Sequence, residues 1–485
     1  MNYKIVRYVL AQIIRLEAVL MVFPLIVSII YGEPIENKLI FLGTAAFMFA
    51  ISFLISNRIR PKNTSLYARE GLVIVALCWF CLSFFGALPF WISKEIPSFV
   101  DAFFEITSGF TTTGTTVIAN IEALSKSMLF WRSFSHFLGG MGVLVFALAI
   151  LPNIGTGSMY VMKAESAGPT FGKLVSKLHI TARVLYIIYG ALTLVLIVIL
   201  MFLGMNWFDA VIQAFGTAGT GGFSNYTDSI AHFNSAAIEG VIGIFMILFG
   251  INFSLYYLLL IGHVKDFFKS EELRVYLGLF ILATIVITLN IMHLYSGFFE
   301  AFRYSFFTTA SISTSTGFSN IDFEAWPLFS KGILLFFMFT GAMAGSTSGG
   351  FKISRLIICI KSAVSEVLIS RQPRRIVRVR YDGKELSFNT IRGVGNYFII
   401  YMLIVVVLTL VLSIHHENFY DNVSLVLGTF NNIGQHMGAY SPSGTGTLEL
   451  SNLSKIALSI GMITGRLEIF PVLILFSRKT WKKHI

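Results

Sequence analysis

Charged side chains are scarce in this chain, which excludes a soluble globular protein. Only 13% of the 485 residues are Asp, Glu, Lys or Arg, whereas 55% are hydrophobic. Apolar runs of about 20 residues recur along the whole length, and each is long enough to cross a hydrocarbon core of ~30 Å. We therefore predict an all-α polytopic membrane protein.

Cysteine is scarce as well, which excludes a disulfide framework. The three cysteines are Cys78, Cys81 and Cys359. Cys78 and Cys81 form a CxxC pair, but this pair lies inside an apolar run with no second pair and no histidine pattern. Metal and redox sites need such partners, so apolar packing is the better interpretation, and we expect no cofactor.

Catalytic motifs are missing too. The sequence contains no P-loop, no HExxH and no GxGxxG. The stretch 345–349 (GSTSG) superficially resembles an intramembrane serine protease site, but such a site needs a histidine base on a neighbouring span. Among nine histidines only His136 and His293 lie within predicted spans, and neither forms a pairing motif. The chain is therefore predicted not to be an enzyme.

The sequence does contain ten apolar spans, near residues 9–31, 38–56, 71–93, 128–150, 181–204, 236–262, 273–294, 328–358, 392–414 and 453–476. Loops on the cytoplasmic side of a membrane protein carry the excess of Lys and Arg. With the N-terminus inside, the outer segments hold few of the 36 basic residues: Lys38, Lys94, Lys126, Arg132, Arg303, Lys331 and Lys455. Both termini are thus predicted to be cytoplasmic. The net charge of +11 reflects topology, and no nucleic-acid partner is expected.

Four similar stretches lie in the outer loops, each between two spans. They are Asp101–Val117, Asp209–Asn225, Tyr304–Asn320 and Asp421–Met437, aligned on Gly114, Gly222, Gly317 and Gly434. An acidic residue stands thirteen positions before the glycine in three of the four, and Asp101 is expected to cap a short helix. The outer acids, Glu105 among them, make this face net negative, although each alone reads most simply as a solvated loop charge.

Each stretch begins with about ten residues of helical character, which span ~15 Å or half a membrane. Such a helix cannot cross, so it must re-enter, and irregular backbone at that depth must be covered by protein or water. Four such helices would direct their partially negative C-terminal ends to one point, which suits a cation.

The loop that follows each helix is predicted to be a selectivity filter. Consecutive inward carbonyl oxygens can replace the hydration shell of an ion, and glycine supplies the dihedral angles that this needs. The candidate filter residues are Thr112, Thr113, Gly114, Thr220, Gly221, Gly222, Ser315, Thr316, Gly317, Asn432, Ile433 and Gly434. Asn and Ile in the fourth loop make the filter only quasi-fourfold.

These four glycine loops resemble those of the bacterial TrkH-type potassium uptake proteins, within the superfamily of K⁺ transporters that carry four membrane–pore–membrane units. The resemblance covers nearly the whole chain, including an extra N-terminal helix pair. It implies uptake of K⁺, with Rb⁺ tolerated, across the bacterial inner membrane. It also implies a homodimer in which each protomer has its own pore, and cytosolic TrkA-type nucleotide-binding subunits on the inner face.

Two elements are candidate gates. The eighth span is interrupted by small residues at 341–350, a composition that unwinds helices. The resemblance implies an intramembrane gating loop there and a pore-blocking arginine in the last span. The candidate gate residues are Gly345, Ser346, Thr347, Ser348, Gly349, Gly350, Lys352 and Arg466. Glu468 is two residues from Arg466 and so is not expected to face it on a helix.

The predicted organisation is four pseudo-repeated units around one pore. It comprises a two-helix appendix (1–70), repeat 1 (71–150, pore loop 101–117), repeat 2 (181–262, pore loop 209–225), repeat 3 (273–358, pore loop 304–320, gating loop 341–350), a basic cytoplasmic linker (359–391), repeat 4 (392–476, pore loop 421–437) and a cytoplasmic tail (477–485).

Two alternatives to a K⁺-selective channel stay open. One is a symporter coupled to H⁺ or Na⁺, for which only Glu17 and Glu468 are mid-membrane carboxylate candidates. The other is a transporter that discriminates less strongly between Na⁺ and K⁺.

Overall fold

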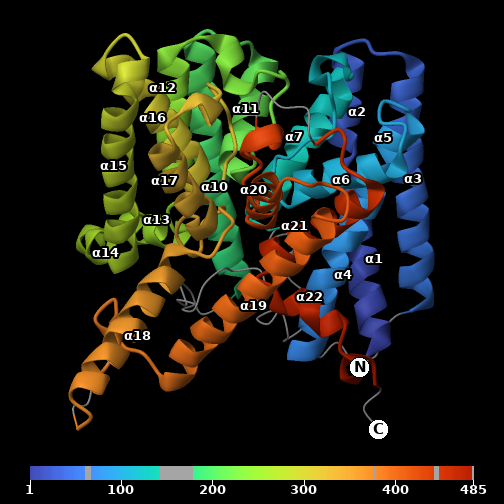
Figure 1. Ribbon diagram of the computed structural model, residues 1–485. Helices are drawn as coiled ribbons and strands as arrows, with labels where there is room; N and C mark the ends of the chain where they lie inside the picture. The colour runs from blue at the N-terminus through green and yellow to red at the C-terminus, as the bar shows by residue number, and fades with distance from the viewer. Residues whose placement is uncertain (60–66, 143–177, 375–376, 442–446, 483–485) are drawn as a thin grey trace.

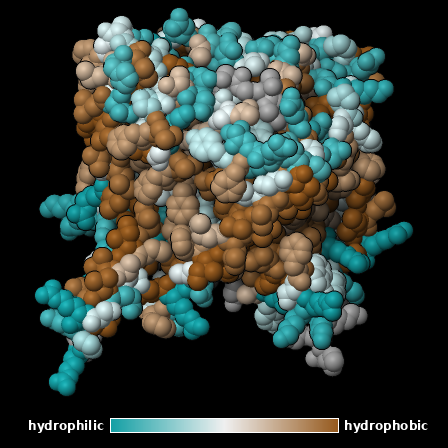
Figure 2. Space-filling model, viewed as in Figure 1, coloured by the Kyte–Doolittle hydropathy of each residue, from teal (hydrophilic) through white to brown (hydrophobic). Residues whose placement is uncertain are grey.

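The computed structural model describes residues 1–59, 67–142, 178–374, 377–441 and 447–482. Within these ranges the chain is mostly helical, with one short antiparallel hairpin of β1 (Arg380–Tyr381) and β2 (Lys384–Glu385). Figure 2 shows apolar side chains as a belt between polar upper and lower ends. The prediction of an all-α polytopic membrane protein is confirmed.

The two N-terminal spans flank the first repeat and belong to no unit (Figure 1). They are α1 (Tyr3–Leu20) with α2 (Val22–Ile30), and α3 (Ile35–Arg58). Ser52 of α3 donates a hydrogen bond to the Ala11 carbonyl at 2.5 Å, and Arg15 donates one to the Ser56 hydroxyl at 2.6 Å. Satisfying these polar groups inside the pair stabilises it within a membrane.

The four units follow in chain order. Repeat 1 holds α4 (Ala68–Gly86), α5 (Leu88–Ile92), α6 (Phe99–Phe110), η1 (Ile121–Ala123) and α7 (Lys126–Gly140). Repeat 2 holds α10 (Leu178–Phe202), α11 (Trp207–Gly219), η2 (Ser229–Phe233), α12 (Ala236–Phe249), α13 (Phe253–Leu260) and α14 (Val264–Lys269). The predicted end of repeat 1, at residues 143–150, lies outside the described residues.

Repeat 3 holds α15 (Glu271–Ile291), η3 (Met292–Leu294), α16 (Phe298–Ser313), η4 (Phe323–Ala325), α17 (Leu328–Thr340) and α18 (Ile353–Arg371). Repeat 4 holds α19 (Phe388–Leu412), α20 (Phe419–Phe430), η5 (Gly438–Tyr440), α21 (Asn452–Arg466) and α22 (Phe470–Leu475), before η6 (Arg478–Trp481). The predicted boundary at residue 358 falls inside α18, and the β1–β2 hairpin joins α18 to α19.

The second span of a unit is rarely one straight helix. In the described residues, six helices are long and apolar enough to cross a membrane, and a seventh span counts if α12 and α13 are taken together across their 91° bend. The α17–α18 span is broken at 341–352, as predicted. The α21–α22 span is also broken, with positive φ at Glu468 (+56°) and Ile469 (+67°). The predicted spans at 236–262 and 453–476 thus each contain two helices, and the hydropathy pattern did not indicate these breaks.

The N-terminus and the last described residues lie at the end of the molecule opposite the pore loops (Figure 1). The Met1 amino group donates a hydrogen bond to the Lys482 carbonyl at 2.9 Å, so these two ends of the described chain are neighbours. The α18–α19 arm projects from this same end. All three features therefore share one face, as the charge distribution predicted.

Candidate ion pathway

Each repeat contributes one short pore helix that ends at the centre of the molecule. These helices are α6, α11, α16 and α20, with 12, 13, 16 and 12 residues. At 1.5 Å per residue none can cross a ~30 Å core, so each re-enters, as predicted.

The N-terminal caps of these helices are not the predicted aspartates. Ser98, Asn206 and Asn418 cap α6, α11 and α20, each accepting a hydrogen bond from the backbone amide three residues on. Asp101, Asp209 and Asp421 instead stand in the first helical turn. A carboxylate there still stabilises the positive end of the helix dipole. The helices thus begin earlier than the aligned stretches suggested.

The loops after the helices share one unusual backbone conformation. The residue two before each glycine has a positive φ: Thr112 (+56°), Thr220 (+53°), Ser315 (+55°) and Asn432 (+54°). The glycines follow at Gly114 (+86°), Gly222 (+75°), Gly317 (+86°) and Gly434 (+79°). A left-handed non-glycine residue costs roughly 1–3 kcal/mol, so the surrounding structure must enforce it at all four positions.

The loop amides turn back toward the pore helices. The residue before each glycine donates its amide to the carbonyl five residues earlier: Thr113 to Ser108 (2.8 Å), Gly221 to Gly216 (2.9 Å), Thr316 to Ser311 (2.8 Å) and Ile433 to Gly428 (2.8 Å). In a trans peptide the carbonyl points opposite to the amide. The preceding carbonyl oxygens therefore point away from the helices.

The four loops close into a ring. Each filter glycine leaves no space for a Cβ atom, because a carbonyl oxygen of the next loop occupies it. These pairs are Gly114 with Gly221, Gly222 with Thr316, Gly317 with Ile433, and Gly434 with Thr113. The contacts run from loop one through loop four and back to loop one. Eight of the twelve predicted filter residues make these contacts, and the other four directly precede them in the chain: Thr112, Thr220, Ser315 and Asn432. The carbonyl oxygens in the ring belong to Thr113, Gly221, Thr316 and Ile433.

The support behind the ring differs from loop to loop. In loops one and three a threonine hydroxyl holds the residue before the glycine, with Thr111 at 2.8 Å from Thr113 and Thr314 at 2.7 Å from Thr316. In loop two, where Gly221 has no side chain, the His136 ring fills the space. In loop four, Tyr401 donates to Asn431 at 2.8 Å. The architecture is therefore fourfold in its backbone only.

The extended segment after each loop is held by a hydrogen bond at the third residue after the glycine. In three of the hydrogen bonds this residue donates: the Val117 amide to Glu105 (3.0 Å), the Asn320 side chain to Glu239 (2.8 Å) and the Met437 amide to Ser424 (2.7 Å). In the second loop it accepts, and the Gln213 side chain donates to Asn225 at 2.9 Å. Glu105 and Gln213 both stand nine residues before their glycine. A polar residue at the same position of two mostly apolar helices is the sequence pattern that could have indicated them.

Glu105 and Arg132 form a buried ion pair, contrary to the interpretation of both as solvated loop charges. The distance from Arg132 Nε to Glu105 Oε1 is 2.6 Å, and the side chains are 1% and 0% exposed, respectively. Arg132 also donates to the Ser224 carbonyl at 2.8 Å and lies 3.4 Å from the Phe223 ring centroid. The pair therefore joins α6, α7 and the second pore loop.

Removing one member of this pair should destabilise the fold strongly. Glu105→Ala leaves Arg132 buried without its partner, and we expect a loss of about 3–5 kcal/mol in unfolding free energy. Denaturant unfolding in detergent measures this. Glu385→Ala, which breaks the exposed Arg378–Glu385 pair, is the control and should change little. Equal stability of the two variants would contradict a structural role for Glu105.

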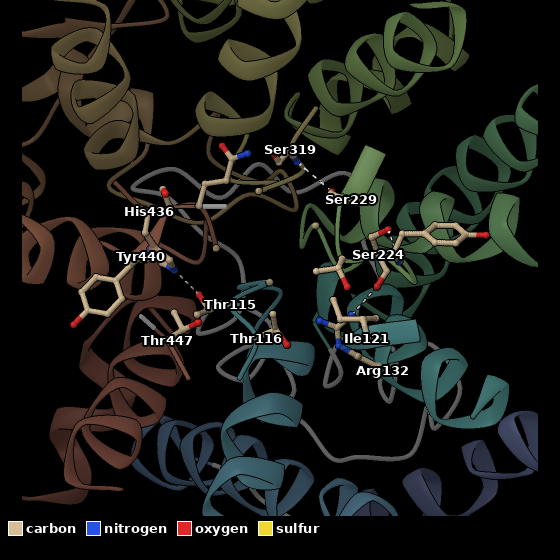
Figure 3. A pocket seen from close by; sticks show the side chains of 18 residues that line it. Thr115, Thr116, Ile121, Arg132, Ser224, Ser229, Ser319, His436, Tyr440 and Thr447 are labelled. Carbon is tan, nitrogen blue, oxygen red and sulfur yellow. Dashed lines mark hydrogen bonds between the residues drawn. The ribbon is translucent and has the colours of Figure 1, made fainter. Parts of the chain in front are cut away.

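A cavity of about 140 Å³ opens above the ring (Figure 3). All four filter glycines line it, together with polar groups from every loop. Thr115 and His436, 3.0 Å apart, bridge loops one and four on one side. The histidine was not singled out from the sequence. The cavity is therefore lined by polar groups down to the glycines of the ring.

An outer carboxylate ties two of the loops together beside this cavity. Glu122 accepts hydrogen bonds from the Thr227 amide (2.9 Å) and hydroxyl (3.0 Å). The Thr227 amide in particular holds the pKa of the Glu122 carboxyl below its ordinary value. This link is present at neutral pH and is lost only as the pH falls through that lowered pKa.

The predicted gating loop lies directly beneath the ring. The Gly349 amide donates to the Ser315 hydroxyl of the third filter loop at 2.6 Å. A Cβ atom on Gly349 would overlap the Asn431 carbonyl oxygen, so the loop also touches the fourth filter loop. Thr347 donates to the Phe249 carbonyl at 3.2 Å. The loop thus contacts repeats 2, 3 and 4 at once.

Arg466 is the last residue of α21, and its side chain extends beneath the ring from repeat 4 to the end of α7 in repeat 1. Its guanidinium donates to the Thr347 carbonyl (2.7 Å) and to the Gly139 (2.6 Å) and Gly140 (2.5 Å) carbonyls at the end of α7. A Cβ atom on Gly139 would overlap the carbonyl oxygen of Phe110, the last residue of α6. A Cβ atom on Gly465 would likewise overlap that of Phe430, the last residue of α20. Arg466 therefore joins repeats 1, 3 and 4.

Other charges flank the gating loop. Lys352 is buried, has a φ of +72°, and points its ammonium back at the Ser348 carbonyl. The carboxylate of Glu468 forms an ion pair with Arg355 of α18. The two-residue spacing predicted only that Glu468 would not face Arg466, and it did not indicate Arg355 as the partner. The break between α21 and α22 makes this pairing possible, because it turns Glu468 toward α18. Three cationic side chains, those of Lys352, Arg355 and Arg466, therefore lie next to the predicted gating loop.

This geometry defines a polytopic membrane protein in which four re-entrant loops surround a single axis. The chain belongs to the TrkH family, described as cation transport proteins, whose profile matches residues 39–483. Membership of this family places the chain among transport proteins and not among enzymes.

Named relatives match the chain over nearly its full length. The Trk system potassium uptake protein TrkG of Escherichia coli is 33% identical over 99% of both chains. The corresponding TrkH of Vibrio parahaemolyticus is 34% identical over 99% of this chain and 100% of its own. The crystal structure of the potassium transporter TrkH from Vibrio parahaemolyticus superposes with a TM-score of 0.89 at 32% identity, covering 99% of this chain and 100% of the other.

Proposed function

We propose that this protein takes up K⁺, and Rb⁺ in its place, through the ring of the four pore loops. The ring of carbonyl oxygens from Thr113, Gly221, Thr316 and Ile433 carries this proposal, because such oxygens can replace the hydration shell of a K⁺ ion. The relatives named as potassium uptake proteins support the choice of ion. The transported K⁺ is substrate, and the proposal involves no cofactor.

The loop at 341–350 is proposed as the gate, with Arg466 as its latch. Its contacts with Ser315 and Asn431 support this role, because a loop so close to the ring must move before an ion can pass. Arg466 and Lys352 place positive charge on the path below, where it opposes a cation.

The protein is proposed to reside in the bacterial inner membrane with both termini in the cytoplasm. The basic segment around α18 and α19 then faces the cytoplasm, as the positive-inside rule requires. That face is also the proposed site for TrkA-type nucleotide-binding subunits. A homodimer with one pore per protomer completes the proposed assembly.

One observation favours the coupled alternative enough to test it. Both carboxylate oxygens of Glu17, within α1, are buried with no hydrogen-bond partner among the described residues. An unpaired carboxylate is costly in a membrane, so Glu17 is best accommodated with a proton bound. A group that binds a proton at this depth could couple K⁺ flux to H⁺.

The reversal potential of purified protein in planar bilayers tests the proposal. We expect it to follow the K⁺ gradient alone and to stay unchanged when a pH gradient is added. A shift with pH that disappears in Glu17→Gln would instead establish coupling to H⁺. A reversal potential that follows Na⁺ as closely as K⁺ would contradict the proposed selectivity.

A further inference from the structure

Glu272 stands where three separate elements meet below the gating loop. It lies in the first turn of α15, and its side chain is buried. One carboxylate oxygen accepts the Ala344 amide at 2.8 Å and the Ser354 amide at 3.0 Å. The other accepts the Tyr381 hydroxyl at 3.1 Å.

Each of these donors belongs to a different part of the chain. Ala344 is in the gating loop, Ser354 is in the first turn of α18, and Tyr381 is on β1 of the hairpin. Apolar contacts join the same parts, because Tyr381 shares a buried cluster with Ala342 and Met343 of the loop. The hairpin therefore reaches the gating loop through both a carboxylate and a packed core.

The remainder of the hairpin faces outward. Arg380, Asp382, Gly383, Lys384 and Glu385 are exposed, whereas Tyr381 is only 5% exposed. Two links fasten the hairpin to its base: the Glu271 amide donates to Asp382 at 2.7 Å, and Lys361 of α18 donates to the Arg380 carbonyl at 2.8 Å. A displacement of the exposed turn would therefore also displace Tyr381, which lies between these two links.

We propose that Tyr381 and Glu272 are positioning residues that hold the gating loop closed and couple it to the β1–β2 hairpin. This inference rests on the proposed role of the loop as the gate. A buried carboxylate is stabilised by each hydrogen bond that it accepts, and bonds to charged groups are stronger than neutral ones. Withdrawal of the Tyr381 hydroxyl leaves one buried carboxylate oxygen without its donor, and the closed arrangement then becomes less stable than one in which this oxygen reaches water and the Ala344 amide is released.

Tyr381→Phe removes this one hydroxyl and keeps the ring in its cluster. We expect the maximal rate of ⁸⁶Rb⁺ uptake into proteoliposomes to rise by up to about tenfold. The Rb⁺ concentration for half-maximal rate and the Rb⁺/Na⁺ ratio should not change, because the ring is untouched. A merely damaged fold would lower the rate. Glu385→Gln, which removes only the exposed Arg378–Glu385 pair, is the matched control and should match the wild type.

A double variant tests whether the two residues act through one another. Glu272→Gln should also raise the rate, and Tyr381→Phe should add little in the Glu272→Gln background. Additive effects, or a Tyr381→Phe rate equal to wild type while Arg466→Ala is faster, would overturn the coupling and leave the gate intact. If neither Arg466→Ala nor Gly317→Ala alters uptake, the proposed function itself fails.

Discussion

Gly317→Ala is expected to abolish Rb⁺ uptake while the protein still folds and inserts. The added Cβ would overlap the carbonyl oxygen of Ile433 in the next loop, with no flexible side chain to yield. The backbone at this position also has a φ of +86°, which an L-residue adopts only with strain. The substitution therefore displaces a carbonyl from the ring itself.

The same repeat offers a matched control. Gly332 lies in α17, and a Cβ added there meets nothing within 4 Å. Gly332→Ala should transport Rb⁺ at the wild-type rate and should even favour the helix slightly. Both variants are reconstituted into proteoliposomes, and ⁸⁶Rb⁺ uptake is divided by the amount of folded protein, which size-exclusion chromatography measures. This comparison separates a loss of flux from a loss of folding. Wild-type uptake by Gly317→Ala would show that ions do not pass through this ring.

The loops could be predicted from the sequence because their constraints are local. Glycine is required where the backbone lies directly against a carbonyl oxygen of another loop. Four such glycines in equivalent positions allow the four loops to be aligned from the sequence. The residue two before each glycine varies between Thr, Ser and Asn, yet its φ is the same in all four loops. The loop conformation is thus set by the hydrogen bonds to the pore helix and not by one residue type.

The supporting contacts could not be predicted because they join distant parts of the chain. Arg132 looked like an outer-loop charge, and only the fold places it on Glu105, 27 residues away. Two of the breaks in the second spans were hidden as well, those between α12 and α13 and between α21 and α22. The sequence around the first of them, from Phe249 to Phe253, is largely apolar, like that of an unbroken span. A hydropathy scan measures only how apolar a segment is. It cannot detect a bend at which backbone carbonyl groups leave the helix and contact a neighbouring element.

Arg466→Ala is expected to speed Rb⁺ uptake by about tenfold or more, since it removes a unit positive charge from a low-dielectric path. It also releases three carbonyl oxygens, those of Thr347, Gly139 and Gly140, which the guanidinium now joins. The gating loop then loses its tie to repeat 1. ⁸⁶Rb⁺ uptake into proteoliposomes measures the rate, and Arg478→Ala, an exposed arginine of the same C-terminal region, should leave it unchanged.

Arg466→Lys distinguishes the two contributions of this arginine. Lysine keeps the charge, but its ammonium is a point donor and cannot reproduce the planar fork that reaches carbonyls in both α7 and the loop. If charge sets the barrier, Arg466→Lys should transport as slowly as the wild type. If the tie to Gly139 and Gly140 holds the loop, Arg466→Lys should approach the rate of Arg466→Ala. Wild-type rates in both variants would remove Arg466 from the gate, and the Tyr381–Glu272 contact would then have to hold the loop without it.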